Sequence, residues 1–393
     1  MEIQEIVHIF ERSPQAKALL KLLDRKTQKT VFLSGLVCSS APLFFAAVKE
    51  RLARPVLFVL NDADEAGYFY HDLVQILGQD QAFFFPSTYR RAVKYGQKDA
   101  ANEILRTEVL ARLASSQPLY VVTYPDALAE MVVSKKNLDE RIIKLAVGDQ
   151  VSLMDISHQL RDFDFMETDY VYEPGQFAIR GSILDIYSYS CEFPFRIDFF
   201  GDEIDTIRTF SIEDQLSRDR RESVEIVPEL SLAEGEKLPF LHFLDKRAVV
   251  AMKDFTFVYD RIDQIYKEGF SSQSMEGATE VEAERIRRAM KKELNLSSAL
   301  QFQQGVAERQ RIEFGIAEQG VAERKTEEAA DVVPFHIVPQ PLFHKNFDLI
   351  GQMMEDYLLQ QYTLYILADS SKQQQRLKDI FESEELKRYQ VRF

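Results

Sequence analysis

The loop that offers the clearest test for nucleotide chemistry is SGLVCSSAP, residues 34–42, which lies between an apolar run and a helical pattern. A phosphate-binding loop has the spacing G-x-x-x-x-G-K-[ST], in which the lysine pairs with the phosphates and the hydroxyl holds magnesium. Gly35 fits this spacing. Ser40 then stands at the second glycine, Ala41 at the lysine and Pro42 at the hydroxyl. We therefore expect no ATP hydrolysis here; from the pattern alone the loop is either a relic of a nucleotide site or an ordinary strand-to-helix turn.

Other residues with catalytic side chains do not form a recognisable pattern. A glycosidase-like pair needs two carboxylates about 5–10 Å apart across a cleft, whereas the acids of residues 185–205 fall at strand ends and in a tight turn, where acids are common: Asp185, Asp198, Asp202, Glu203 and Asp205. The six histidines are scattered, and Cys38 and Cys191 stand alone without a Cys-x-x-Cys spacing. The sequence predicts no catalytic residue and no metal site.

Residues 195–203, FRIDFFGDE, alternate like a half-buried strand with one exception. Arg196 and Asp198 fall on the charged face, but so does the large aromatic Phe200. Either Phe200 packs inward under the following glycine, or it is exposed for binding. Arginine and aromatic residues dominate interface hot spots, so Arg180, Arg196 and Phe200 are candidate partner-binding residues.

Charge favours a protein partner over a nucleic acid. The chain has a formal net charge of −15, and residues 170–222 contain six arginines, no lysine and eleven acids. Phosphate contacts need clustered basic residues, whereas arginines in an acidic segment are suited to pairing with carboxylates on a protein.

The composition is that of a globular protein. The chain has 393 residues, of which 46% are hydrophobic and 28% charged. It has no apolar run near the roughly 18 residues of a membrane span, no secretory signal at its N-terminus, and two isolated cysteines that fit a reducing compartment. We expect a cytoplasmic protein without a membrane contact.

Four regions follow from the alternation of apolar patterns. Strands alternating with helices over 1–140 predict an α/β domain with a mostly parallel sheet. Residues 141–222 read as a small α+β domain with hairpins, and residues 223–345 as apolar strands (AVVAM, FTFVY) followed by a polar helical stretch at 276–331 of no predicted function. Residues 346–393 predict a helix, a strand (YTLYILAD) and a helix, the truncated start of a further α/β domain.

Two segments carry a resemblance to a known family. YEPGQFAIRGSILDIYS and PFRIDFFGDEIDTIRTFSIEDQLS resemble the segment shared by the excision-repair helicase UvrB and the transcription-repair coupling factor Mfd. The shared pattern is G-x-[FY]-x-x-R-G-x-[IL]-[LV]-D-[IVL], then P-[YF]-R-[ILV]-[DE]-F-F-x-D-E-I. Unlike UvrB, this chain lacks the nucleotide-loop lysine and a tyrosine-rich hairpin after FPSTYRR. It therefore looks like the amino-terminal UvrB-like module of Mfd.

The resemblance implies a fold and a partner. It implies a degenerate P-loop, helicase-like domain (1A, 1–140), an inserted UvrB domain 2-like unit that binds UvrA (141–222), a 1B region (223–345) and the start of domain 3 (346–393). Carried over by position, the UvrA contacts are Arg180, Arg196 and Phe200, which should share one exposed patch. ATP, magnesium, RNA polymerase and DNA would be handled by carboxy-terminal parts of the family that this chain lacks.

Three hypotheses are open at this point. The first is a recruitment module without catalysis that brings UvrA to stalled RNA polymerase. The second is an ATP-dependent DNA-loading protein of the helicase family, like UvrB itself; Ala41 at the lysine position argues against it. The third is a small glycan- or metabolite-processing enzyme on the same sheet, which no motif supports.

Overall fold

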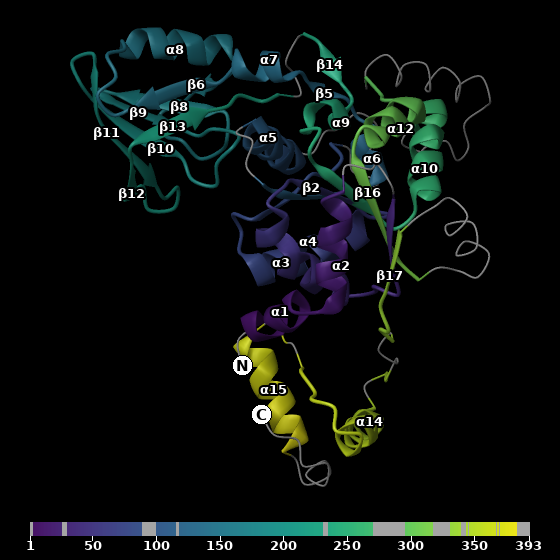
Figure 1. The fold of residues 1–393 in the computed structure, drawn as a ribbon. Helices are drawn as coiled ribbons and strands as arrows, with labels where there is room; N and C mark the ends of the chain where they lie inside the picture. Colours follow the sequence, from purple (N-terminus) through teal and green to yellow (C-terminus); the bar gives the residue numbers. More distant parts are fainter. Residues whose placement is uncertain are drawn as a thin grey trace, which may run out of the picture. The chain divides into compact units, whose positions relative to one another are not determined.

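The computed structural model describes the greater part of the chain: residues 3–25, 30–88, 100–114, 118–230, 235–269, 295–316, 331–338, 343–344, 346–366, 368 and 370–382. It divides into two units, Met1–Ile337 and Val338–Phe393, which are described separately. The first contains a large and a small domain, drawn in Figure 1.

The large domain is built on a seven-stranded sheet whose strands are all parallel, in the order β17-β1-β16-β15-β2-β4-β3. The strands are β1 (Val31–Ser34), β2 (Val56–Val59), β3 (Ala82–Phe84), β4 (Tyr120–Thr123), β15 (Val249–Met252), β16 (Gln310–Gly315) and β17 (Asp331–Pro334). Every residue of β2, β4 and β15 is buried, as expected where helices cover both faces of a parallel sheet. The predicted α/β fold class is confirmed.

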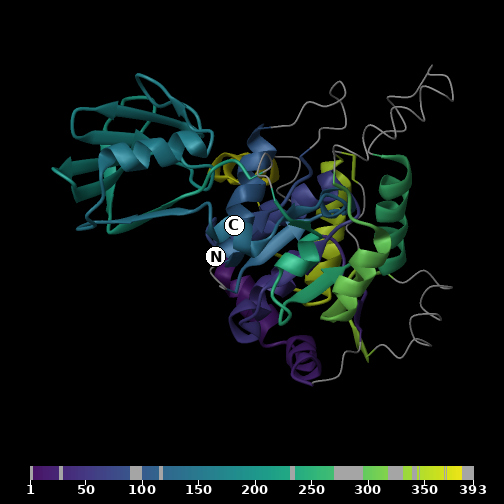
Figure 2. The same cartoon turned by 90° about the horizontal axis from the view of Figure 1, so that it is seen from above.

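Helices flank this sheet in two groups that Figures 1 and 2 show apart, α1–α4 and the group of α6, α10 and α12. The described helices of the large domain are α1 (Ile3–Glu11), α2 (Pro14–Leu23), α3 (Ser40–Leu52), α4 (Ala63–Leu77), α5 (Ala100–Ala114), α6 (Pro125–Leu128), α7 (Lys135–Asp139), α9 (Phe240–Phe243), α10 (Phe255–Glu268) and α12 (Ala299–Ala307). Local signals set their starts: the Ser13 side chain accepts from the backbone N–H of Ala16, and Pro14 follows at the first helical position.

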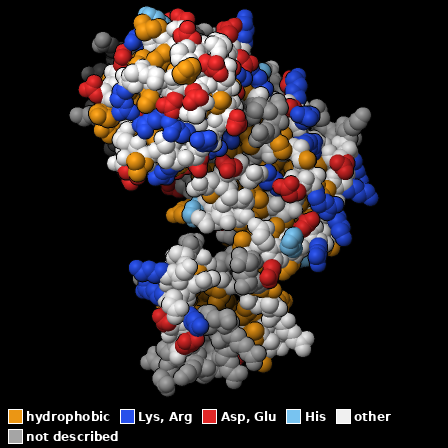
Figure 3. Space-filling model, turned by 90° about the vertical axis from the view of Figure 1, so that its left-hand side faces the viewer, with side chains coloured by type: hydrophobic (Ala, Val, Ile, Leu, Met, Phe, Trp, Pro, Cys, Tyr) orange, Lys and Arg blue, Asp and Glu red, His pale blue; other side chains and the backbone are white. Residues whose placement is uncertain are grey.

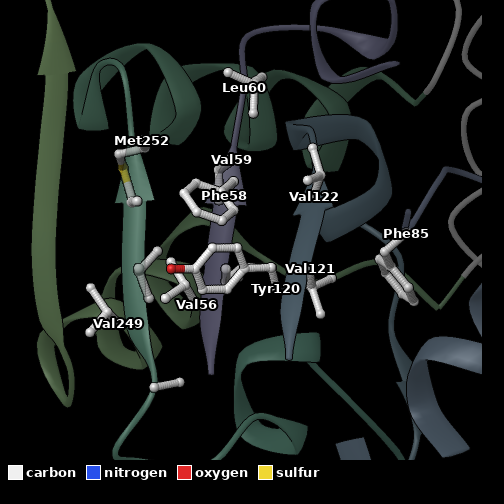
Figure 4. Packing of buried hydrophobic residues seen from close by; sticks show 14 of the residues in the cluster. Val56, Phe58, Val59, Leu60, Phe85, Tyr120, Val121, Val122, Val249 and Met252 are labelled. Atoms are coloured by element: carbon white, nitrogen blue, oxygen red, sulfur yellow. The ribbon is translucent and has the colours of Figure 1, made fainter. Parts of the chain in front are cut away.

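Aromatic side chains fill the core between sheet and helices. Phe58 and Tyr120 project from neighbouring strands (Figure 4), with ring centroids 5.1 Å apart. The Tyr120 hydroxyl donates to the backbone oxygen of Phe45 at 2.8 Å, so its polar end is satisfied inside the core. This packing fixes the positions of the strand ends and of the loops that follow them.

The small domain is an insertion in the large one. Its elements are β6 (Ile143–Ala146), α8 (Leu153–Asp162), β7 (Met166–Glu167), β8 (Gln176–Arg180), β9 (Ile183–Ile186), β10 (Phe195–Phe200), β11 (Glu203–Phe210), β12 (Ser217–Arg221) and β13 (Ser223–Ile226). The chain enters through β6 and leaves through β13, which pair with each other, and the preceding β5 (Val132–Val133) pairs with the following β14 (Lys237–Leu238). The six strands β12-β11-β10-β9-β8-β7 form its sheet.

The predicted division at residue 223 is wrong in one respect. Strands β15, β16 and β17, from the region 223–345, hydrogen-bond into the sheet of residues 1–140. The two regions are therefore one domain interrupted by the small one. Local patterns could not show this, because strand neighbours in a parallel sheet are far apart in sequence.

Two predicted strands are also wrong. FTFVY opens helix α10 instead, because Asp254 caps its start by accepting from the backbone N–H of Phe257. In the second unit, residues 362–366 of YTLYILAD form no strand, and the described elements are α14 (Phe347–Leu359) and α15 (Ser371–Phe381). The predicted strand at the end of the chain, and most of the polar stretch 276–331, fall outside the described residues.

Candidate protein-interaction site

The candidate site lies on the outer face of the six-stranded sheet. Along β10 buried residues alternate with more exposed ones, and the side chains at 195, 197 and 199 enter the core of the small domain. Tight turns join β8 to β9 and β10 to β11, where Gly181 (φ 65°) and Gly201 (φ 66°) adopt the left-handed conformation that glycine favours. The hairpins therefore place Arg180, Arg196 and Phe200 on the opposite face.

A buried carboxylate organises this face. The Asp185 side chain, on β9, is fully buried and accepts from Arg196 in a bidentate pair, Nε to Oδ1 at 2.7 Å and Nη2 to Oδ2 at 2.8 Å. A guanidinium of the neighbouring strand, that of Arg180, donates to the same Oδ2. One acid thus pairs with two arginines, and its pair with Arg196 has the fork geometry that makes such pairs strong.

Arg196 is held on all sides. Its Nη1 donates to the backbone oxygen of Gln215 at 3.0 Å, and its guanidinium lies 4.5 Å from the ring centroid of Phe210. The hydrogen bonds to Asp185 raise the pKa of Arg196. Only 14% of its side chain is exposed. Arg196 therefore positions the face more than it presents a free charge to a partner.

Arg180 is less enclosed. Its guanidinium lies 4.9 Å from the ring centroid of Tyr170, and 34% of its side chain is exposed. It can donate further hydrogen bonds outward while keeping its contact with Asp185, because a guanidinium carries five N–H donors.

Phe200 is the exposed member of the set, with 83% of its surface accessible. It ends β10 opposite Glu203 of β11. The alternative that Phe200 packs inward under Gly201 is therefore wrong. An aromatic side chain this exposed, on a rigid hairpin, fits a hot-spot contact.

The predicted single exposed patch is borne out only in part. The three residues share one face of the sheet, but their exposure falls from Phe200 through Arg180 to Arg196. The charge of Arg196 is already paired with Asp185, and a direct contact of Arg196 with the partner stays a prediction. Alternation along one strand shows which face a side chain takes, but it does not show the acid that the next strand places beside it.

A second ion pair on this face was missed from the sequence. Asp198 accepts from Arg208 and, at 2.8 Å, from the Thr206 hydroxyl. The signal was present in the alternation of EIDTIRTF, which places residues 206 and 208 on one face of β11. The five candidate acids prove to be of different kinds: Asp185 and Asp198 belong to these pairs, and the others lie at or near the turn.

The loop after β1 does not fit a nucleotide phosphate with magnesium. Ala41, at the lysine position, offers no charge and is buried to 2% exposure, and Pro42 has no backbone N–H. A Cβ added to Gly35 would lie 2.3 Å from the backbone oxygen of Phe335. The Ser40 hydroxyl donates to the backbone oxygen of Val37 within the loop.

No cluster of three or more metal-binding side chains occurs among the residues that the structure describes. Within that same part of the chain, no helix is both long and apolar enough to cross a membrane.

Comparison with known proteins identifies the small domain. Residues 143–231 match the family model described as the UvrB interaction domain. The small domain is thus similar to a UvrB interaction domain. The match covers both β6 and β13 and ends nine residues after the predicted bounds of 141–222, and it confirms the resemblance to a UvrB-like module.

The relatives agree with this assignment. The chain is 26% identical over 227 residues to the transcription-repair-coupling factor of Bacillus subtilis, covering 57% of this chain and 19% of the relative. It is 32% identical over 198 residues to that of Haemophilus influenzae, covering 50% and 17%. It is also 26% identical over 285 residues to the UvrABC system protein B of Thermotoga neapolitana, covering 67% and 41%. The chain thus spans less than a fifth of the coupling factors it matches.

Proposed function

We propose that this chain is a recruitment module without catalytic activity, which binds the excision-repair protein UvrA through the outer face of its small domain. The observation that carries the proposal is Phe200, exposed to 83% on a hairpin whose neighbouring arginines are fixed by Asp185. A rigid, exposed aromatic beside a partly free arginine loses little conformational freedom on binding. The UvrB interaction domain and the similarity to UvrB support UvrA as the partner.

The proposal extends to transcription-coupled nucleotide excision repair in the cytoplasm. The similarity to transcription-repair-coupling factors supports a role in bringing UvrA to stalled RNA polymerase. In this proposal, polymerase contact, DNA contact and ATP-dependent translocation belong to other parts of a coupling factor. The residues of the β1 loop support a module that needs neither ATP nor magnesium, because Ala41 and Pro42 replace the groups that would hold them.

The test is a binding titration between this chain and purified UvrA. Phe200→Ala should weaken binding about 30-fold, the equivalent of ~2 kcal/mol for a hot-spot aromatic. Tyr68→Ala is the matched control, since Tyr68 is an equally prominent aromatic (77% exposed) on α4 of the large domain, and it should leave binding unchanged. Equal affinity of the wild type and the Phe200 variant, with the fold intact by circular dichroism, would refute the site.

The alternative is a UvrB-like, ATP-dependent DNA-loading protein of the helicase family, favoured by the similarity to protein B of the UvrABC system over 67% of this chain. It predicts ATP turnover and tight DNA binding that weakens steeply with salt. Neither is expected for the recruitment module, so one ATPase assay and one DNA titration at two salt concentrations separate the two functions.

A further inference from the structure

The strand register aligns three arginines in a row across the outer face of the small domain. Arg196 on β10 lies opposite Asp185 on one side and opposite Arg208 of β11 on the other. Arg208 in turn lies opposite Arg220 of β12. Residues directly opposite in antiparallel strands have neighbouring Cβ atoms on the same face, so these side chains form a ladder that runs from a buried acid to the edge of the sheet.

The three arginines of this ladder have more N–H donors than the neighbouring acids have oxygens to accept them. Arg196 is paired with Asp185, and Arg208 is paired with Asp198. The Nε of Arg208 is nevertheless buried without a hydrogen-bond partner. The side chain of Arg220 makes no ion pair or hydrogen bond within the part of the chain that the structure describes, and all five residues of β12 are exposed.

This arrangement is unfavourable for the isolated domain. Like charges directly opposite on neighbouring strands destabilise a sheet. Asp185 pairs with Arg196 and Asp198 pairs with Arg208, which offsets the repulsion between these two arginines. Among the described residues, no carboxylate lies between Arg208 and Arg220 to offset theirs. Positions that break a local rule of stability without compensation are characteristic of functional surfaces. A carboxylate supplied by a partner could pair with Arg220 and offset this repulsion.

We infer that Arg220 is a further partner-binding residue, and that the contact surface runs from Phe200 to the edge strand β12, where it receives a carboxylate of an acidic protein surface. This inference rests on the proposed function and adds a residue and a charge requirement to the same face. The order of exposure supports it, because Arg196 is 14% exposed, Arg208 is 32% exposed, and the side chains of β12 are open to solvent.

The extent of this surface suits one protein interface. Neighbouring strands lie about 4.8 Å apart, so Arg220 stands roughly 10 Å from Arg196 across the sheet. Phe200 is four residues further along β10, about 13 Å at a strand's rise per residue. Both distances fit within a standard interface of about 800 Å² per partner.

The surrounding charge favours a protein carboxylate over a nucleic-acid phosphate. Lys and Arg side chains form a band on the small domain in the view of Figure 3, with acidic side chains beside it. Residues 170–222 contain six arginines, no lysine and eleven acids, and the whole chain has a formal net charge of −15. A phosphate backbone carries a charge at every nucleotide, so the acidic side chains beside the band would repel it more than they repel a single protein carboxylate, which a guanidinium can bind in two hydrogen bonds.

The experiment compares Arg220→Ala and Arg220→Glu with the wild type in titrations against purified UvrA. Arg221→Ala is the matched control, since Arg221 is the adjacent residue of the same strand but lies opposite Ile207, on the other face. We expect Arg220→Ala to weaken binding about tenfold and Arg220→Glu more, whereas the control should change it less than twofold. Thermal unfolding should show no loss of stability in the Arg220 variants, because the substitution removes a repulsion.

The outcomes separate this inference from the proposed function. If Phe200→Ala weakens binding and Arg220→Ala does not, the inference is wrong and the proposed function stands. If the wild type does not bind UvrA at all, both fail. A lower unfolding temperature for Arg220→Ala would assign the side chain a structural role. Binding of a DNA duplex that depends on Arg220 would mean that the arginine binds a phosphate and not a protein carboxylate. Either of these last two results overturns the inference.

Discussion

The loop after β1 and the outer face of the small sheet differ in how far their side chains are exposed to solvent. In the loop, the backbone N–H of Gly35 donates to Gly315 and that of Phe335 donates to Ser34, while Ala41 is buried. Two backbone hydrogen bonds thus tie the end of β1 to the segments beside it. On the small domain, the fold leaves Phe200 and Arg220 open.

Under the proposed function, this chain acts away from the place where its fold usually binds a ligand. Open α/β sheets bind ligands at the carboxyl ends of their strands, and the β1 loop stands there. There the Ser40 hydroxyl and the backbone N–H of Gly35 donate to the chain's own carbonyl oxygens. The outer face of the small sheet differs from this loop: Asp185 holds two arginines in place, and the side chains beside them are exposed to solvent.

The largest expected effect is on Asp185, the acid that holds the outer face together. Asp185→Ala should lower the free energy of unfolding by about 4 kcal/mol, because it leaves Arg180 and Arg196 without their shared, buried partner. Urea denaturation measures this. Asp205→Ala, at an exposed position of β11, should stay within about 0.5 kcal/mol. A loss below ~1 kcal/mol for Asp185→Ala would mean that the arginines are positioned by something else.

The matching change in the loop is Gly35→Ala. Gly35 has φ +82°, and an added Cβ would meet the backbone oxygen of Phe335 at 2.3 Å. We expect a loss of about 3 kcal/mol in the free energy of unfolding, from backbone strain and the displaced segment. Gly67→Ala is the control: in the interior of α4, with nothing within 4 Å of its Cβ, it should stabilise by about 0.5–1 kcal/mol. An unchanged stability for Gly35→Ala would show that the Phe335 segment does not close the loop.

The sequence predicted the architecture of both regions better than their contacts. Alternating strands and helices correctly indicated a parallel sheet, and the period of FRIDFF correctly separated the buried face of β10 from the outer one. FTFVY was misassigned because a short apolar run fits a strand and a buried helix alike; the cap at Asp254 decides it.

What could not be predicted depends on pairs that are distant in sequence. Asp185 meets Arg196 through the register of β9 and β10, and Gly35 meets Phe335 although 300 residues separate them. Arg220 stands out only once the order of strands is known. Residue types and local periods do not encode register, so the exposure of Arg196 and the arginine ladder required the structure.

A smaller effect is expected from Arg196→Lys, which keeps the charge but not the bidentate fork. The lysine can replace one of the two hydrogen bonds to Asp185, so we expect a loss of about 1–2 kcal/mol in the free energy of unfolding. Arg221→Lys, with no bidentate pair on the described part of the chain, should cost nothing measurable. If Arg196→Lys weakens UvrA binding at unchanged stability, Arg196 contacts the partner directly and the positioning role is wrong.

The smallest expected effect is that of nucleotide on the wild-type protein. Mg-ATP at millimolar concentration should leave the midpoint of thermal unfolding unchanged, because the β1 loop offers no lysine, no hydroxyl at Pro42 and no free space above Gly35. A nucleotide present at 100 times its Kd would instead stabilise the folded state by about 2.7 kcal/mol, which is several degrees for a domain of this size. Differential scanning fluorimetry distinguishes the two results, with AMP in the absence of magnesium as the control. A shift specific to Mg-ATP would mean that the large domain keeps a ligand site. The contrast between a closed β1 loop and an exposed outer face on the small sheet would then no longer hold.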